Sequence, residues 1–577
     1  MTITLPPKVE AAEWIRCERC GEIVYGKRFA RELGVCPGCA LHTRITARER
    51  VEQLFDDGST VVIEAPPTPE DPLGFTDSKP YPERLREARE KSGLDEAVLC
   101  VRGTIDGHGI VAAVMDFRFM GGSLGSAVGA RIVAAAEAAL VERVPFLLVT
   151  ASGGARMQEG TLSLMQMATT SQALAELDEA GILTIALITD PTYGGVAASF
   201  ATLPDVLLAE PGAHVGFAGP RVIEQTIGQE LPEGFQTAEF LRARGLIDDV
   251  RPRAELRSTL ARLCSLQAAG AAGELFQPER SPAGEPSRLL FQPERMPAGE
   301  PSRLLFQPER VPARSGWTAV QLARHADRPT TLDYARYMLE EFVELHGDRL
   351  GGDCPAIVGG LGRLDGRPIV LIGHQKGHTT KERVERNFGM PTPAGYRKAA
   401  RLMRLAAKLG CPILTLVDTP GAYPGLEAEE NGQAWAIAEN LRLMSTLPVP
   451  VVAVVTGEGG SGGALALGVA NRVLALSNAV YSVISPEGCA SILWKSPSAA
   501  PRAAEALRLD ARELLRHRIV DGVIPEPGEG AHTDPALTAR LLAAAVAEAF
   551  GDLSIHEPRK LIADRRQRFR QFGTGSR

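Results

Sequence analysis

VPFLLVTASGG, residues 144–154, is a run of β-branched and other apolar residues that ends in a glycine pair. This pattern predicts a buried strand followed by a tight turn. The next segment, LSLMQMATTSQALAELDEAG (162–181), has apolar residues at helical spacing. A second strand, ILTIALITD (182–190), then leads into YGGVAASFATL (193–203), where glycines open a second helix. Strands that alternate with helices predict parallel βαβ units in an α/β fold.

The same succession of elements occurs again in the second part of the chain. A strand, a helix, a strand and a glycine-opened helix are expected at CPILTLVDTPG (411–421), QAWAIAENLRLMSTL (433–447), VPVVAVVTGEGG (449–460) and GGALALGVA (462–470). Glycine stands at each strand-to-helix turn in both parts. We therefore expect two tandem copies of one α/β fold whose sequences have diverged.

A direct repeat separates the two copies. FQPERSPAGEPSRLL (276–290) is followed by FQPERMPAGEPSRLL (291–305) and then by FQPERVPA (306–313). Proline removes backbone donors and blocks the interior of both helices and sheets. The period of 15 residues is also shorter than that of common solenoid repeats. We expect residues 263–314 to form a semi-rigid and largely unpaired linker.

Composition limits the possible classes of protein. The chain has 577 residues, enough for at least two large domains, and its 44% apolar and 23% charged residues are typical of globular proteins. The net charge of -7 disfavours a protein that wraps nucleic acid. No apolar run approaches the ~20 residues that span a bilayer. The first residues do not resemble a secretory signal, and we expect a cytoplasmic location.

Four of the nine cysteines form one cluster near the start of the chain. Cys17, Cys20, Cys36 and Cys39 follow the pattern C-x2-C-x15-C-x2-C. Four thiolates at this spacing can complete a tetrahedral zinc shell and leave no open position. The sequence therefore predicts one structural zinc ion, whereas the scattered remaining cysteines do not suggest a disulfide framework.

The glycines at the second turn of each copy are candidate catalytic residues. Gly194 and Gly195 open one helix, and Gly462 and Gly463 open the other. Glycine lets a ligand approach the backbone amides, which at a helix N-terminus favour an anion. Such amides can form an oxyanion hole, although close packing of helix on strand also explains glycine at such turns. The sequence contains no G-x-S-x-G, H-E-x-x-H or P-loop lysine motif. We therefore expect the chemistry to rest on backbone amides and on the substrates themselves.

Several long segments resemble the carboxyltransferase of bacterial acetyl-CoA carboxylase. The first copy is similar to its beta subunit and the second to its alpha subunit. The matching stretches are the four-cysteine ribbon, FRFMGGSLGSAVGAR (117–131), ASGGARMQEGTLSLMQMA (151–168), TDPTYGGVAASFA (189–201), GFAGPRVIEQT (216–226), QLARHADRPTTLDY (321–334), IGHQKG (372–377), RNFGMPTPAGYRKA (386–399), DTPGAYPGLEAEE (418–430), GEGGSGGALALG (457–468) and YSVISPEGCASILWK (481–495).

The resemblance implies a crotonase-superfamily (ClpP/crotonase) fold in both copies. With it, the chain divides into a zinc ribbon (13–41), a beta-like domain (42–262), the linker (263–314), an alpha-like domain (315–560) and a C-terminal tail (561–577). It also implies transfer of a carboxyl group from carboxybiotin to acetyl-CoA, which gives malonyl-CoA for fatty acid synthesis. On this basis Gly194 and Gly195 are expected to stabilise the acetyl-CoA enolate, and Gly462 and Gly463 the ureido oxygen of biotin.

The resemblance implies several partners. Biotin is expected on a separate carboxyl carrier protein, since the chain has no M-K-M-like biotinylation site, and ATP is expected to act on a separate biotin carboxylase. The active site should lie where a first half meets a second half, so a homodimer or higher oligomer is expected. The alternatives are a carboxyltransferase for another acyl-CoA such as propionyl-CoA, a biotin-dependent decarboxylase subunit, or a nucleic-acid-binding zinc-ribbon protein. The last is disfavoured by more than 500 further residues of α/β enzyme pattern.

Overall fold

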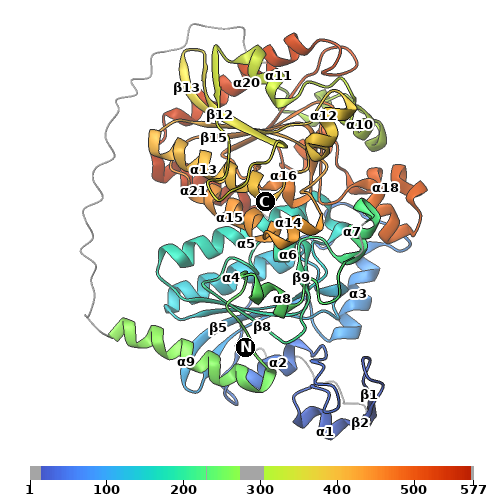
Figure 1. The fold of residues 1–577 in the computed structure, drawn as a ribbon, viewed down its shortest axis with the longest axis vertical. Coiled ribbons are helices and arrows are strands. Elements are labelled where there is room, and N and C mark those ends of the chain that lie inside the picture. The colour runs from blue at the N-terminus through green and yellow to red at the C-terminus, as the bar shows by residue number, and fades with distance from the viewer. Residues whose placement is uncertain (1–13, 229–230, 273–303, 574–577) are drawn as a thin grey trace.

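The computed structural model describes residues 14–228, 231–272 and 304–573. Figure 1 shows two lobes stacked along the long axis, with the first copy below the second and the cysteine-rich ribbon at the far end of the first. Most of the repeat lies outside the described residues. Within the described ranges, no helix combines the length and apolar character needed to cross a lipid bilayer.

Each lobe is built on an eight-stranded sheet, and the two sheets have the same strand order. The first runs β10-β8-β7-β6-β5-β4-β3, with β9 paired to β7; the second runs β18-β16-β15-β14-β13-β12-β11, with β17 paired to β15. The central strands pair in parallel and the first three in each sheet are antiparallel. This equivalence confirms the expected duplication. The strands are β3 (Val61–Val62), β4 (Val98–Ile105), β5 (His108–Met115), β6 (Phe146–Ser152), β7 (Thr184–Tyr193), β8 (Val206–Ala209), β9 (Val215–Gly216), β10 (Asp249–Val250), β11 (Glu341–Glu344), β12 (Ile357–Leu364), β13 (Arg367–His374), β14 (Ile413–Thr419), β15 (Val451–Gly460), β16 (Arg472–Leu476), β17 (Val480–Ser482) and β18 (Gly522–Ile524).

Helices cover both faces of the sheets, which explains why the predicted strands are apolar along their whole length. Every residue of β6 and of β14 is buried. The helices are α1 (Gly26–Arg31), α2 (Ala47–Leu54), α3 (Tyr81–Ser92), α4 (Ser126–Glu142), α5 (Gly160–Glu179), α6 (Gly194–Ala197), α7 (Pro220–Ile227), α8 (Ala238–Ala243), α9 (Arg253–Ala272), α10 (Gly316–Ala323), α11 (Thr331–Met338), α12 (Thr380–Glu385), α13 (Pro393–Leu409), α14 (Leu426–Glu430), α15 (Gln433–Thr446), α16 (Ser461–Leu465), α17 (Pro486–Cys489), α18 (Ala500–Leu507), α19 (Ala511–Arg516), α20 (Pro535–Ser554) and α21 (Pro558–Arg570). The helices expected at 193–203 and 462–470 are the short α6 and α16.

The two lobes meet through α5 of the first and α15 of the second (Figure 1). Almost the whole length of α5 is buried, because it packs on its own sheet and on the other lobe. Its buried threonine and serine side chains donate to backbone oxygens, so a helix that is buried on nearly all sides carries them without unpaired hydroxyls. The interface between the two lobes, formed around α5 and α15 and called the joint below, therefore lies within one chain.

The last segment is not a free tail. The predicted boundary at 560 falls inside α21, which packs against both α5 and α15. Arg565 is fully buried and donates to the carbonyls of Met444, Leu447 and Val449. The backbone oxygen of Phe569 accepts a hydrogen bond from Thr169 of α5 at 3.0 Å. Arg566 and Arg570 of α21 also form ion pairs with Glu179 and Glu176 of α5, across the interface between the lobes.

The end of the repeat is also more ordered than a free linker. The N–H of Leu305 donates to the oxygen of Val523 in β18 at 2.8 Å, and the N–H of Val523 donates back to Leu305 at 3.0 Å. Val311 is buried. Leu305 thus forms an isolated antiparallel bridge to the second sheet, while the description of residues 263–314 as a largely unpaired linker stays a prediction. At its other end, α9 continues past the predicted boundary at 262 to Ala272. The remaining domain boundaries stay a prediction.

Candidate active site and zinc site

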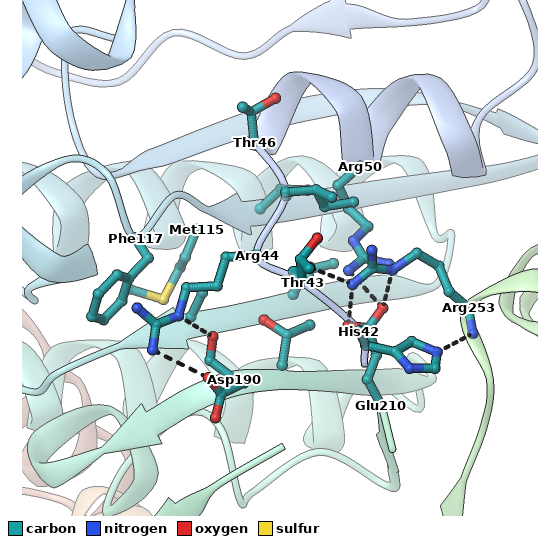
Figure 2. Close-up of a pocket in the computed structure, with 15 residues that line it drawn as sticks. His42, Thr43, Arg44, Thr46, Arg50, Met115, Phe117, Asp190, Glu210 and Arg253 are labelled. Carbon is teal, nitrogen blue, oxygen red and sulfur yellow. Dashed lines mark hydrogen bonds and ion pairs between the residues drawn. The ribbon is translucent and has the colours of Figure 1, made fainter. Parts of the chain in front are cut away.

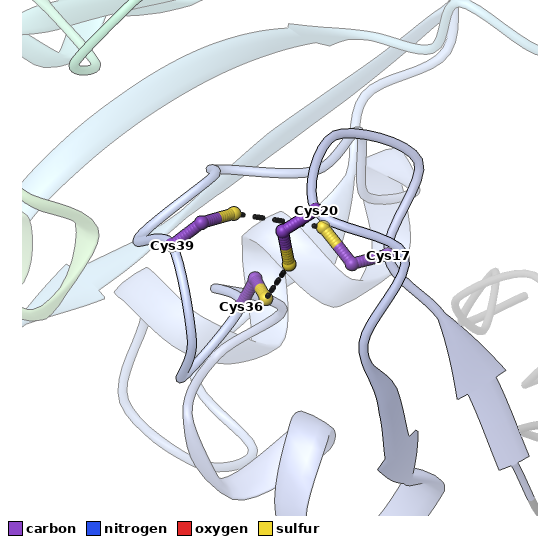
Figure 3. A group of neighbouring side chains, drawn as sticks. All are labelled: Cys17, Cys20, Cys36 and Cys39. Atoms are coloured by element: carbon purple, nitrogen blue, oxygen red, sulfur yellow. Dashed lines mark hydrogen bonds between the residues drawn. The ribbon is translucent and has the colours of Figure 1, made fainter.

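The four cysteines lie together in a small ribbon at the start of the chain (Figure 3). A hairpin of β1 (Trp14–Arg16) and β2 (Ile23–Tyr25) carries the first pair, and a loop after α1 carries the second. All four sulfur atoms lie within 4.8 Å of one another. The Cys17–Cys39 and Cys20–Cys36 sulfur pairs are 3.6 and 3.7 Å apart. Zn–S bonds of about 2.3 Å in a tetrahedron give sulfur separations of about 3.8 Å, so the cluster fits a zinc ion.

A buried ion-pair cluster fastens the ribbon to the first lobe (Figure 2). Glu210 accepts from Arg50 and from Arg253, each at 2.7 Å. Burial alone raises the pKa of a carboxyl, but the two arginines lower the pKa of Glu210 to about 2. Arg253 also donates to the oxygens of Leu33 and Thr43 in and after the ribbon, at 2.7 and 2.9 Å. The ribbon is thus held rigidly by charge-assisted hydrogen bonds.

A second contact joins the ribbon to the region of the catalytic candidates. Arg44 donates to the side chain of Asp190 at 3.2 Å and lies over the ring of Phe117 (Figure 2). Asp190 also accepts from the ring nitrogen of His214 at 2.9 Å, and this contact raises the pKa of His214. Asp190 lies three residues before Tyr193, the N-cap of α6. Arg44, just after the ribbon, thus contacts β7 close to the turn that carries Gly194 and Gly195.

We call the start of α6, with Gly194 and Gly195, the first-lobe turn, and the start of α16, with Ser461 and Gly462, the second-lobe turn. The strand registers decide which residues of the two turns are equivalent. Thr192 of β7 pairs with Ser152 of β6, and in the second lobe Gly459 of β15 pairs with Thr419 of β14. Counting onward, Gly194 matches Ser461 and Gly195 matches Gly462. The backbone agrees, because Gly194 has φ +60° and Ser461 has φ +53°.

The predicted equivalence of the two glycine pairs is therefore wrong by one residue. Gly463 matches Val196 and not a turn glycine. Gly463 is closely packed, because a Cβ there would lie 2.3 Å from the amide nitrogen of Ala422. The residue that sequence reasoning missed is Ser461, since a serine in the left-handed region gives no glycine signal.

In each lobe a second loop lies beside the turn. A Cβ on Gly154 would be 3.6 Å from the Cα of Gly194 and 3.8 Å from the nitrogen of Gly195. In the second lobe, the loop of Gly421 and Ala422 approaches the first turn of α16 in the same way. Amides in the first turn of a helix have no carbonyl partner within that helix. Each lobe thus offers amide donors at a helix start, which can bind an oxyanion.

The two turns face each other across one side chain. A Cβ on Gly195 would lie 3.2 Å from the sulfur of Met167, and a Cβ on Gly462 would lie 2.9 Å from the methyl of the same residue. Met167 belongs to α5, the helix at the joint between the lobes. One chain therefore brings its own first-lobe and second-lobe turns together.

Two ionisable side chains, His374 and Lys376, lie near the second turn. His374 is buried, which lowers its pKa to about 3, so the ring is neutral. Lys376 lies beside a cavity of about 180 Å³ and donates to Asp418 at 2.7 Å and Glu458 at 3.2 Å. Burial opposes its charge, but the two carboxylates raise the pKa of Lys376. A protonated lysine held by two carboxylates is poorly suited to act as a general base.

Family models match three parts of the chain. The acetyl-CoA carboxylase zinc finger domain matches residues 14–39, the carboxyl transferase domain matches 42–237, and the acetyl co-enzyme A carboxylase carboxyltransferase-like model matches 310–573. The first of these models supports the zinc assignment of the four cysteines.

Relatives with the same organisation cover nearly the whole chain. The acetyl-coenzyme A carboxylase carboxyl transferase subunits beta/alpha of Parafrankia sp. is 61% identical over 98% of this chain and 92% of its own length. The protein of the same description from Salinispora arenicola is 57% identical over 97% of this chain and 96% of its own. The carboxyl transferase subunit alpha of Thermus thermophilus is 58% identical over 44% of this chain and 81% of its own. This chain therefore belongs to the acetyl-CoA carboxylase carboxyltransferase family, with a beta-like and an alpha-like part in one polypeptide.

Proposed function

We propose that this chain transfers the carboxyl group of carboxybiotin to acetyl-CoA, which yields malonyl-CoA for fatty acid synthesis. The observation that carries the proposal is the pair of helix-start turns, one from each lobe, that meet at Met167. The reaction must stabilise two oxyanions, the enolate oxygen of the thioester and the ureido oxygen of biotin. Two sets of backbone N–H donors, at the starts of α6 and α16, lie at one interface and match that requirement.

The two turns divide the work in this proposal. Gly194 and Gly195, with the neighbouring Gly154 loop, serve the thioester oxygen of acetyl-CoA. Gly462, with Ser461 before it and the Ala422 loop beside it, serves the ureido oxygen, and Gly463 keeps that loop in place. When the N–CO₂ bond of carboxybiotin breaks, the ureido nitrogen takes the proton from the acetyl methyl group. The methyl carbon then bonds to the released CO₂, so no side-chain base is required.

The zinc ion has a structural role. It would be held by Cys17, Cys20, Cys36 and Cys39, and it supplies cross-linking of a ribbon too small for a core of its own. Arg253 of α9 holds the ribbon to the first lobe through the oxygen of Leu33, and Arg44, just after the ribbon, contacts Asp190 near the first-lobe turn.

The partners in this proposal are a separate biotin carboxyl carrier protein and a separate biotin carboxylase that uses ATP. We also propose assembly into a homodimer or a larger homo-oligomer, and action in the cytoplasm.

The reverse reaction provides the test. Purified protein with free biotin should decarboxylate malonyl-CoA to acetyl-CoA and should need biotin to do so. A much higher kcat/KM for methylmalonyl-CoA would favour the propionyl-CoA alternative, and absence of any biotin-dependent turnover would reject the proposal.

Two variants test the division of work between the turns. Gly195→Val and Gly462→Val should each lower turnover by on the order of a hundredfold, as loss of an oxyanion donor does elsewhere. By calorimetry, Gly195→Val should keep its affinity for biotin and Gly462→Val its affinity for acetyl-CoA. If both variants lose acetyl-CoA and keep biotin, the two lobes share a single anion site.

A further inference from the structure

Glu429 is a buried carboxyl at the joint that the proposed chemistry does not use. It lies in α14, seven residues after Ala422, and only 4% of it is exposed. Its side chain leaves its own lobe and reaches the first one. One carboxyl oxygen accepts from the N–H of Phe217 at 3.0 Å and the other from the N–H of Ala218 at 2.6 Å. Glu429 thus binds a loop that is 211 residues away in sequence.

The loop that Glu429 binds touches both turns. It follows β9, in which Gly216 pairs with Tyr193, the N-cap of α6. On the other side, the ring of Phe217 lies 3.7 Å from the place of a Cβ on Gly462. The position of this loop therefore depends on the spacing between the first-lobe turn and the second-lobe turn.

Gln236 strengthens the same loop. Its side-chain nitrogen donates to the oxygen of Ala218 at 2.8 Å, and the hydroxyl of Tyr193 donates to its side-chain oxygen at 3.5 Å. Gln236 is 1% exposed and has φ +60°, a conformation that side chains other than glycine rarely adopt. Such backbone strain is common where a site must hold a set geometry.

The groups that face Glu429 come from several elements. The amides of Phe217 and Ala218 and the side chain of Gln236 donate toward it, and the half-buried phenol of Tyr193 is its acidic neighbour. Burial raises the pKa of Glu429 to about 7, although these donors act in the opposite direction. At the rim, Glu430 pairs with Arg244 of the first lobe at 2.5 Å, and Glu427 of the same helix is exposed.

We infer that Glu429, as a carboxylate, is a positioning residue for carboxyl transfer: it fixes the Phe217–Ala218 loop and with it the spacing of the two turns. A carboxylate accepts both amides at once. Protonation turns one oxygen into a donor, which cannot face an amide N–H, so the loop is released on one side. The inference holds whichever oxyanion each turn serves, but it concerns the carboxyl-transfer activity proposed above.

The test compares Glu429→Gln with Glu427→Gln, a matched change two residues away on the exposed side. Biotin-dependent malonyl-CoA decarboxylation is measured from pH 5.5 to 9. Wild type and Glu427→Gln should lose kcat/KM below pH about 7 with a single-proton limb. Glu429→Gln should lose that limb and should have kcat/KM lowered on the order of tenfold at pH 8. A Glu429→Gln protein with wild-type kcat/KM and the wild-type acid limb overturns the inference.

A stability measurement needs no activity and separates this inference from the proposed function. Glu429 binds its proton more tightly in the folded chain than in the unfolded chain, where its pKa is about 4.5. Wild type should therefore lose folding stability as pH rises from about 4.5 to about 7. Glu429→Gln lacks that loss, so its Tm should rise relative to wild type over this range. A constant Tm difference, or failure of Glu429→Gln to fold at pH 8, counts against a buried positioning carboxylate.

Discussion

Gly463→Ala tests whether this glycine is a packing residue rather than a donor at the turn. A methyl group at this position would lie 2.3 Å from the amide nitrogen of Ala422, 2.7 Å from the carbonyl carbon of Gly421 and 2.9 Å from the hydroxyl of Tyr396. The first two atoms are backbone and cannot rotate away. An ordinary contact needs about 3.4 Å, so the loop must move by roughly 1 Å.

The size of the effect follows from that displacement. Overpacking of a filled interior costs about 1–3 kcal/mol, and we expect about 2 kcal/mol of lost unfolding free energy, or roughly a 30-fold change in the folding equilibrium. Turnover should suffer more than stability. A catalytic group displaced by about 1 Å can cost on the order of a hundredfold in rate, and the displaced loop borders the Gly462 amide.

Urea unfolding and biotin-dependent malonyl-CoA decarboxylation measure the two effects. Gly462→Ala is the matched control for stability, because its methyl group would crowd only the end of Met167, at 2.9 Å from Cε, and would lie at an ordinary contact distance of 3.7 Å from the Phe217 ring. That flexible side chain can yield, so Gly462→Ala should cost less than about 1 kcal/mol. If Gly463→Ala is as stable and as active as Gly462→Ala, Gly463 is not required for packing against the Gly421–Ala422 loop.

Two further predictions concern the linker and the ribbon. Deletion of Phe291–Leu305 joins Leu290 to Phe306. Leu289 and Leu290 then take the places of Leu304 and Leu305 beside β18. We therefore expect turnover within about twofold of wild type and a change in unfolding free energy under about 1 kcal/mol. Leu305→Pro in the full chain is the contrasting variant, because it removes the N–H that donates to Val523. If Leu305→Pro and the deletion variant have the same unfolding free energy, the contact with Val523 is unimportant. Fresh protein should hold about one zinc ion per chain by elemental analysis, and Cys17→Ser should lose it and become sensitive to proteolysis within residues 14–46. Retention of the metal by Cys17→Ser would exclude this cysteine as a ligand.

Local patterns were enough for the elements and for the zinc ligands. Unbroken β-branched runs predicted β6, β7, β14 and β15, because a parallel sheet covered on both faces needs strands that are apolar throughout. The short spacing within each cysteine pair predicted the sulfur cluster, since two residues between thiols bring them to one metal. The order of these elements also indicated the duplicated fold before any contact was known.

Contacts between distant residues were beyond such patterns. The match between Gly462 and Gly195 depends on the registers of two separate strand pairs, and a serine at φ +53° has no local signature. The docking of Leu305 on β18 was hidden because a proline-rich repeat resembles a free tether.

By itself, the sequence determined that the chain has two α/β copies, a four-cysteine zinc site and the segments typical of this carboxyltransferase family. Only the tertiary structure decided that both turns meet at Met167, that Glu429 crosses to the Phe217–Ala218 loop, and that α21 packs on α5. The physical reason is the distance along the sequence over which each kind of interaction acts. Propensity and periodicity act over a few residues, whereas the contact between Thr169 and Phe569 spans 400 residues and exists only when both lobes are folded and packed.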